Sequence, residues 1–251
     1  MYDAPIAEVS GACFAGDRLV LVGDCEPVLA WATWADGPGQ WHTLDVSALP
    51  GAPSDTGQFE AVEHLDDDIV VILCEEPALL VAVDLGAEQI VGSWHLHVDL
   101  KGLAKPWAKD PNSHGEGFFF GPDRLFIVKE KKPAAIVEFG IRGQESIGAP
   151  RVGTWRPPAD GELSALAWTE LDLEDVSDVC VVGSDIWLLS DKARCMQRLG
   201  DPATALPKHI EKPEGLARTP EGRWLVAVDN THGEGALHVL DGTGQYPDTD
   251  R

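Results

Sequence analysis

The sequence predicts an all-β fold: a five-bladed β-propeller in which blades of three or four antiparallel strands surround a central channel. Two observations predict it. A unit made of an apolar strand, a polar turn and a second apolar strand occurs five times, and the second strand of every unit ends in an acidic residue. Repeated antiparallel units of this length are typical of radial blades, whereas a β-sandwich would not repeat its acids in phase.

The clearest unit runs from His114 to Gly140, HGEGFFFGPDRLFIVKEKKPAAIVEFG. Turn residues at 121–123 separate its first two strands, and the Lys-Lys-Pro sequence at 131–133 separates the second strand from the third. The other units begin at Val9, Phe59, Val176 and Pro213. The acids that end the second strands, named the strand-end acids below, are Asp24, Glu75, Glu130, Asp191 and Asp229.

We expect one domain over residues 1–251, because the loops at 99–115 and 157–172 are insertions between units and not linkers. The predicted blades cover about residues 9–46, 59–98, 115–156, 176–210 and 213–240. Fourth strands are expected at 41–46, at 89–98, at either 151–155 or 163–168, and at 206–210. The strand that closes the last blade comes from residues 2–7 or from the tail near Tyr246.

The charge of the chain disfavours several classes of partner. There are 42 Asp and Glu against 19 Lys and Arg, a formal net charge of -23. Such an acidic chain repels nucleic acid and anionic membranes, which need clustered basic residues. We expect neither a membrane span nor a secretion signal, because no apolar run approaches membrane length and residues 1–14 lack a basic and an apolar region. We therefore expect a cytoplasmic protein, a monomer or weak homo-oligomer, that acts on a small molecule. A composition rich in Ala, Gly, Asp and Trp and poor in Lys indicates a bacterial source.

The five cysteines are odd in number and lack CxxC spacing, and most lie in apolar strand-like runs. They predict reduced thiols of the core, not a disulfide framework or a zinc site.

A second repeated position lies 14 or 15 residues before each strand-end acid, where the first strand of every unit begins. The residues there, named the axial residues below, are Ser10, Glu60, Glu116, Ser177 and Glu214. Because the first strands of a propeller line its channel, these oxygen-bearing side chains should meet at one axis. Calcium takes about 6–8 oxygen ligands and accepts hydroxyl, carboxylate and water together. The sequence therefore predicts a calcium site, or a site for another divalent cation; the alternative is a polar, water-filled channel without metal.

The residue after each axial residue is small in four units: Gly11, Ala61, Gly117 and Gly215. We expect it to let neighbouring backbones approach near the axis. Asp178 is the exception, and an acid there could alter the ring.

Other candidates lie at the same end of the predicted channel. Histidine titrates near neutrality, so a histidine two residues before Glu116 can serve as acid or base. The candidate catalytic residues are His114, Glu75, Glu130 and Lys129. The candidate substrate-binding residues are Lys131, Asn112, Asp191, Asp229, Asn230 and Trp107. The alternatives are an exposed loop histidine, solvated lysines in a turn and an aromatic of the core; Lys129 and Glu130 should point to opposite faces of their strand.

The stretches EVSGACF at Glu8, GEGFFFGPDRLFIVKEKKP at Gly115, DVSDVCVVGSDIWLLSD at Asp175 and KPEGLARTPEGRWLVAVDN at Lys212 resemble the SdiA-regulated family of five-bladed propellers, which adjoins the esterase-like phytase group. The resemblance covers about residues 8–240. The order of Ser and Glu among the axial residues is also similar to the calcium ring of calcium-activated apyrases, which implies a calcium ligand at each axial position. The long basic and aromatic loops of nucleotide-binding relatives are missing here.

Two functional hypotheses follow. The first is a metal-dependent hydrolase, cyclase or isomerase in which the cation acts on a small anionic, carbonyl or ester substrate at the channel mouth. The second is a non-catalytic propeller that binds a ligand or a protein and holds a structural metal ion.

Overall fold

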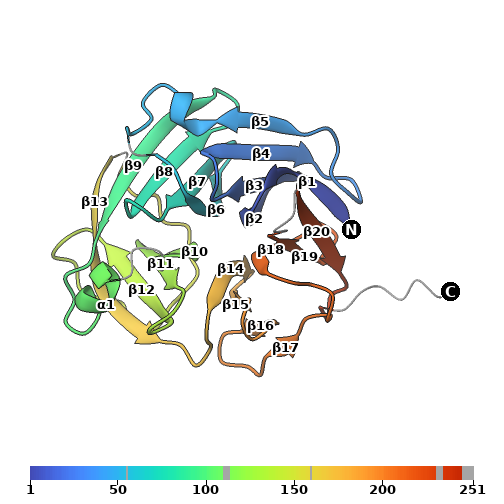
Figure 1. Cartoon of the computed structure of the whole chain (residues 1–251). Coiled ribbons are helices and arrows are strands. Elements are labelled where there is room, and N and C mark those ends of the chain that lie inside the picture. The colour runs from blue at the N-terminus through green and yellow to red at the C-terminus, as the bar shows by residue number, and fades with distance from the viewer. Residues whose placement is uncertain (55, 110–113, 159, 230–233, 245–251) are drawn as a thin grey trace.

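The computed structural model describes residues 1–251 except 55, 110–113, 159, 230–233 and 245–251. The fold is all-β, as predicted, and its strands form one eight-stranded and three four-stranded sheets. Figure 1 shows these sheets arranged around a common centre in a propeller-like manner.

Two of the four-stranded sheets follow the chain in simple antiparallel order. The first contains β2 (Val9–Ala15), β3 (Arg18–Gly23), β4 (Val28–Thr33) and β5 (His42–Asp45). The second contains β14 (Val176–Val182), β15 (Asp185–Ser190), β16 (Cys195–Arg198) and β17 (Thr204–Ala205).

The third four-stranded sheet joins the two ends of the chain. Its order is β1 (Tyr2–Ala7), β20 (Glu234–Leu240), β19 (Trp224–Val228) and β18 (Pro213–Arg218). Tyr2 pairs with Leu237, so residues 2–7 supply the closing strand.

The eight-stranded sheet consists of two antiparallel halves. One half is β6 (Phe59–Asp66), β7 (Ile69–Cys74), β8 (Leu79–Asp84) and β9 (Gln89–His97), and the other is β10 (Gly117–Gly121), β11 (Arg124–Lys129), β12 (Ala135–Gly140) and β13 (Asp160–Glu170). The parallel pair β13–β9, from Asp160↔Ser93 to Ser164↔His97, joins the halves. The short helices η1 (Val46–Ala48) and α1 (Ala104–Lys109) lie in connections.

Of the two alternatives for the fourth strand of the third unit, residues 163–168 are confirmed, because they lie within β13. Residues 151–155 form no strand: the amides of Gly153 and Trp155 donate to the carbonyls of Phe120 and Gly121 at 2.8 and 3.2 Å. In the fourth unit the outer strand is Thr204–Ala205 and not residues 206–210. Pro207 lies inside the expected segment, and proline cannot donate to a strand ladder.

The inner strands form a closed circle of contacts in the order β2, β6, β10, β14, β18 and back to β2, around the centre of Figure 1. Five clusters of buried apolar side chains hold this circle in place. Phe59, Phe118 and Trp224 are among their largest fully buried members. Apolar packing between neighbouring sheets therefore holds the N-terminal ends of the inner strands at one axis. Neither helix in the described part of the chain has the length and apolar character needed to cross a membrane.

Candidate functional site

A polar cavity of about 270 Å³ opens at the N-terminal ends of the inner strands. Its wall contains four axial residues and four strand-end acids: Ser10, Glu60, Glu116, Glu214, Asp24, Glu75, Glu130 and Asp229. Glu8, Val9, Gln58 and Lys131 complete the wall. The axial Ser177 and the strand-end acid Asp191 lie outside this wall. We name this space the central cavity.

Bulges in the inner strands explain how most axial side chains are aimed. The strand register shifts between Val9 and Gly11, between Phe59 and Ala61, and at the equivalent places in β14 and β18. An axial residue is therefore the extra residue of each of these four bulges. A bulge leaves one residue outside the ladder and redirects its side chain. The fifth axial residue, Glu116, directly precedes β10, and its amide donates to the Val128 carbonyl at 3.0 Å.

The residue two positions before each bulged axial residue has a left-handed backbone. These residues are Glu8, Gln58, Asp175 and Lys212, with φ values of 50°, 48°, 56° and 46°. In three units the carbonyl of this residue accepts a bond from the amide of the strand-end acid, at 3.3 Å for Asp24, 3.2 Å for Glu75 and 3.1 Å for Asp229. This bond joins the start of strand one to the end of strand two, so axial residue and strand-end acid lie beside each other.

The glycines after the axial residues lie where the next inner strand passes. A Cβ atom on Gly11 would lie 2.8 Å from the Ala61 Cα and 3.1 Å from the Glu60 carbonyl oxygen. A Cβ atom on Gly117 would lie 2.7 Å from the Val179 amide nitrogen. The absence of a side chain therefore allows the close approach of backbones that brings the axial residues together.

The axial serines bond to the neighbouring strand. Ser10 Oγ donates to the carbonyl of Phe59, and Ser177 Oγ donates to that of Pro213 at 2.6 Å. Phe59 and Pro213 directly precede the axial Glu60 and Glu214. Each serine therefore tethers the strand that presents the next axial carboxylate.

Asp178, the acid at the small-residue position, makes a similar connection. One carboxylate oxygen accepts from the Val179 amide at 2.7 Å and the other from the Leu216 amide at 2.6 Å. Asp178 is buried, and its two hydrogen bonds connect β14 to β18.

The carboxylates of the central cavity repel one another. Burial, followed by the charge of Glu75, raises the pKa of Glu60 to about 9. Burial and the charge of Glu60 raise the pKa of Glu116 well above its usual range. Burial, Asp191 and Asp229 raise the pKa of Glu214 to about 8. Desolvation and like charges both disfavour ionised carboxylates, and a bound cation would relieve both.

Two carboxylate oxygens in the wall have no hydrogen-bond partner among the described residues. These buried atoms are Glu130 Oε2 and Asp229 Oδ1. The other oxygens of the two groups bond to Lys131 and to Lys212, the latter at 2.7 Å. Buried unpartnered acceptors are costly. Oxygen atoms of this kind suit a hard cation, so the residues present fit the predicted metal.

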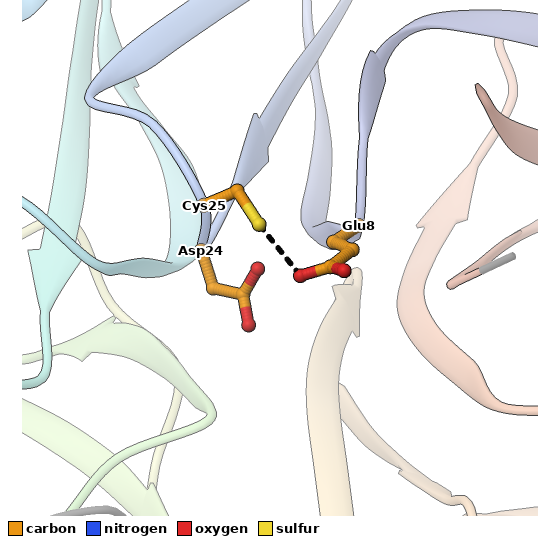
Figure 2. A group of neighbouring side chains, drawn as sticks. All are labelled: Glu8, Asp24 and Cys25. Atoms are coloured by element: carbon orange, nitrogen blue, oxygen red, sulfur yellow. Dashed lines mark hydrogen bonds between the residues drawn. The ribbon is translucent and has the colours of Figure 1, made fainter. Parts of the chain in front are cut away.

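Sequence reasoning did not single out one group at the edge of the cavity, formed by Glu8, Asp24 and Cys25. One potential ligand atom of each residue lies within 4.8 Å of the others, and Figure 2 shows the three side chains pointing toward one another. Cys25 Sγ donates to Glu8 Oε2 at 2.7 Å. Glu8 could have been found by comparing the units, since it lies two positions before an axial residue, as Gln58 and Lys212 do. The prediction of core thiols holds for the other four cysteines and is wrong for Cys25, which is exposed because it follows the end of β3.

Of the remaining candidates, His114, Lys129 and Trp107 lie outside the wall of the central cavity. The His114 amide donates to Glu75 Oε1 at 3.0 Å, and its ring stacks on Trp107 with 4.6 Å between centroids. Its Nε2 lies 2.8 Å from the Trp107 carbonyl oxygen, so His114 holds α1 and Glu75 in place. Lys129 is fully buried, and its Nζ donates to the Lys131 carbonyl at 2.5 Å. Asn112 and Asn230 lie outside the described residues.

Comparisons with known proteins agree with this architecture. The chain is similar to Myxococcus xanthus glutaminyl cyclase, with 11% identity, 95% of this chain and 94% of that chain covered, and a TM-score of 0.55. A chain of a nidogen–laminin complex is 11% identical, with 94% of this chain and 77% of that chain covered and a TM-score of 0.50. Staphylococcus aureus virginiamycin B lyase is 11% identical, with 94% of this chain and 72% of that chain covered and a TM-score of 0.45. Identities this low show the fold alone, and the glutaminyl cyclase, whose TM-score is above 0.5, has a fold of the propeller type.

No curated protein matches the sequence. The family model described as SdiA-regulated matches residues 51–229. This segment contains four of the five axial residues and four of the five strand-end acids, and it confirms the resemblance stated above. Because the matched segment spans more than half of the length of this chain, the chain belongs to the SdiA-regulated family.

Proposed function

We propose that the protein is a five-bladed propeller whose central cavity binds calcium or another hard divalent cation, and that it uses this cation as an enzyme. The count of five takes the eight-stranded sheet as two blades, since each half is a complete antiparallel unit that begins with an inner strand. The observation that carries the proposal is the convergence of eight carboxylates on one cavity of about 270 Å³.

The ligands would be the carboxylates of Glu60, Glu116 and Glu214, with Asp229 Oδ1 as a further oxygen. Ser10 also lies in the wall, whereas the position of Ser177 favours a tether. A bound cation of this kind supplies a Lewis acid for a carbonyl, phosphoryl or carboxylate oxygen.

The chain itself supplies groups that can move a proton. Burial and the neighbouring Asp175 raise the pKa of Glu130 to about 7, which suits general acid–base catalysis near neutrality. Lys131 donates to Glu130 and also lines the cavity, so it can orient an anionic oxygen there. The substrate class is a small anionic, carbonyl- or ester-containing molecule, and the reaction a hydrolysis, cyclisation or isomerisation in the bacterial cytoplasm.

The alternative is a non-catalytic binding propeller with a structural ion. It is favoured by the hydrogen bonds of Ser10, Ser177 and Asp178, which join neighbouring inner strands at the axis. Here the cation would fasten the inner strands and take no part in a reaction.

Elemental analysis and calorimetric titration with calcium test the metal site, after removal of bound ions with a chelator. We expect one tightly bound divalent ion per chain. A screen of esters, lactones and phosphate esters with and without chelator then separates the enzyme from the alternative. Turnover that survives complete metal removal contradicts the enzyme proposal, and absence of any metal binding contradicts both.

A further inference from the structure

A larger groove adjoins the central cavity. It has a volume of about 780 Å³ and is lined by residues 131–134, 170–175 and 192–193. These segments are the turn after β11, the connection from β13 to β14, and the turn after β15. We name this space the side groove. Its volume falls within the range of about 300–1,000 Å³ that is typical of small-molecule sites.

Lys131 connects the two spaces, because it lines both the central cavity and the side groove. Its ammonium group donates to Glu130 Oε1 and lies 4.0 Å from Asp175 Oδ1. An ammonium group has three donors, so one remains available to a ligand in the groove. A molecule in the side groove can therefore place one end beside Lys131 and the wall of the central cavity.

The floor of the side groove is apolar and held in place. The connection 171–175 alternates, with Leu171, Leu173 and Asp175 half-buried and the two intervening acids exposed. The two leucines pack against a buried apolar cluster. The Leu171 amide donates to the Ala134 carbonyl at 2.9 Å, which fixes the connection to the turn opposite. This floor suits an apolar body.

The exposed charged groups at the rim of the side groove contribute little to the choice of ligand. Lys192 Nζ lies 2.5 Å from Glu174 Oε2, and the two side chains are 62% and 76% exposed. Exposed pairs of this kind are screened by solvent and salt. The Lys131 side chain, by contrast, is only 35% exposed. The charges at the inner end of the groove are therefore those of Lys131, of its partners Glu130 and Asp175, and of the proposed cation.

We infer that the side groove binds an amphipathic carboxylate, or the ester or amide of one, with its apolar body on Leu171 and Leu173 and its oxygen-bearing head beside Lys131 at the central cavity. This inference deepens the proposed function and rests on it, since the bound cation supplies the second positive charge at the head. It names the substrate class by its two ends: an apolar chain or ring and one carboxyl-type head.

Calorimetric titration of the calcium-loaded protein with sodium octanoate tests the inference. We expect one saturable site. Leu173→Gln should weaken binding about fivefold, and Lys131→Met about tenfold, whereas Lys131→Arg keeps the charge and should restore most of the affinity. Ile141→Gln is the matched control, because Ile141 is 43% exposed and is not among the residues that line the groove. Octylammonium should not bind, and 1-octanol should bind about tenfold more weakly than octanoate.

Several outcomes would overturn the inference: no saturable octanoate binding, equal binding of octanol and octanoate, or equal effects of the Leu173 and Ile141 variants. Titration of the same samples with calcium alone separates this inference from the proposed function. Calcium binding without octanoate binding leaves the metal site and removes the groove ligand. Octanoate binding that depends on Leu173 and Lys131 in a protein that binds no calcium removes the metal site and leaves the groove.

Discussion

Ser177 Oγ donates a 2.6 Å hydrogen bond to the carbonyl oxygen of Pro213, the residue that directly precedes Glu214. Ser10 bonds to Phe59 in the same way, directly before Glu60. In both units the axial serine of one inner strand is hydrogen-bonded to the neighbouring inner strand, directly before the axial glutamate of that strand. The circle of inner strands is thus held together partly by serine hydroxyls that donate hydrogen bonds from one inner strand to the next.

Ser177→Ala is expected to lower stability and to leave calcium affinity nearly unchanged. The loss of one buried hydrogen bond costs about 0.5–1.5 kcal/mol of the free energy of unfolding, which urea denaturation measures. Calcium affinity should stay within about twofold, because Ser177 lies outside the wall of the central cavity. The exposed Ser54→Ala is the matched control. A drop in affinity of about tenfold or more would instead make the Ser177 hydroxyl a ligand.

Glu116→Gln is expected to act in opposite directions with and without calcium. The substitution removes one of several mutually repelling carboxylates, so the calcium-free protein should melt at a higher temperature. It also removes a ligand, so calcium affinity should fall by about tenfold or more. Melting curves with chelator and with calcium measure both effects.

Glu162→Gln serves as the control, because the Glu162 side chain is 68% exposed and far from the axis in the strand order. This control should change neither the melting temperature in chelator nor the melting temperature in calcium. An unchanged calcium-induced shift in Glu116→Gln would remove Glu116 from the site.

The stability of the calcium-free protein should fall as the pH rises. The pKa values of Glu60 and Glu214 are about 9 and about 8, both above the ordinary value of 4.5. At a pH between the ordinary value and these raised values, the folded protein holds more protons than the unfolded chain. The free energy of unfolding therefore falls as the pH rises. Melting temperatures in chelator should therefore decrease from about pH 5 to about pH 8.

Calcium should reverse this trend. Binding requires ionised carboxylates and releases protons, so affinity should rise over the same pH range, by about tenfold per pH unit for each proton released. Calorimetry in buffers of different ionisation enthalpy counts the protons. A pH-independent affinity would show that the carboxylates with raised pKa values take no part in binding.

Gly11→Ala is expected to destabilise the protein by about 1–3 kcal/mol. The new Cβ would lie 2.8 Å from the Ala61 Cα, and the nearby atoms are backbone atoms that cannot rotate away. Calcium affinity should also fall, since the shift moves Glu60. Gly57→Ala is the control, because a Cβ atom there meets nothing within 4 Å. Equal urea midpoints for the two variants would contradict the role assigned to Gly11.

Much of the fold could be predicted from the sequence because each unit carries its own local signals. Alternation and turn residues predicted the strands from Phe118 to Phe139 almost to the residue. The outer strands were harder, because the parallel pairing of β13 with β9 joins segments far apart in the chain and leaves no local pattern. Residues 151–155 have a strand-like composition, yet they bond to the end of β10 and not to a sheet edge.

The candidate site shows the same division. The repeat spacing located Glu60, Glu116 and Glu214, which do line one cavity, although their role as ligands stays a prediction. Spacing could not show that Ser177 would face Pro213, that Lys129 would be fully buried, or that Asp178 would bond to Leu216. Each of these contacts depends on the rotation of one inner strand against the next.

The sequence by itself determined which residues occupy equivalent positions, because a repeated unit places its polar residues at the same step of the same strand. The tertiary structure alone decided which of them share a space. Bulges turn the axial side chains inward, and the closed circle from β2 to β18 brings them close enough to alter one another's pKa. Closure is a property of all the sheets packed together, so no single unit contains it.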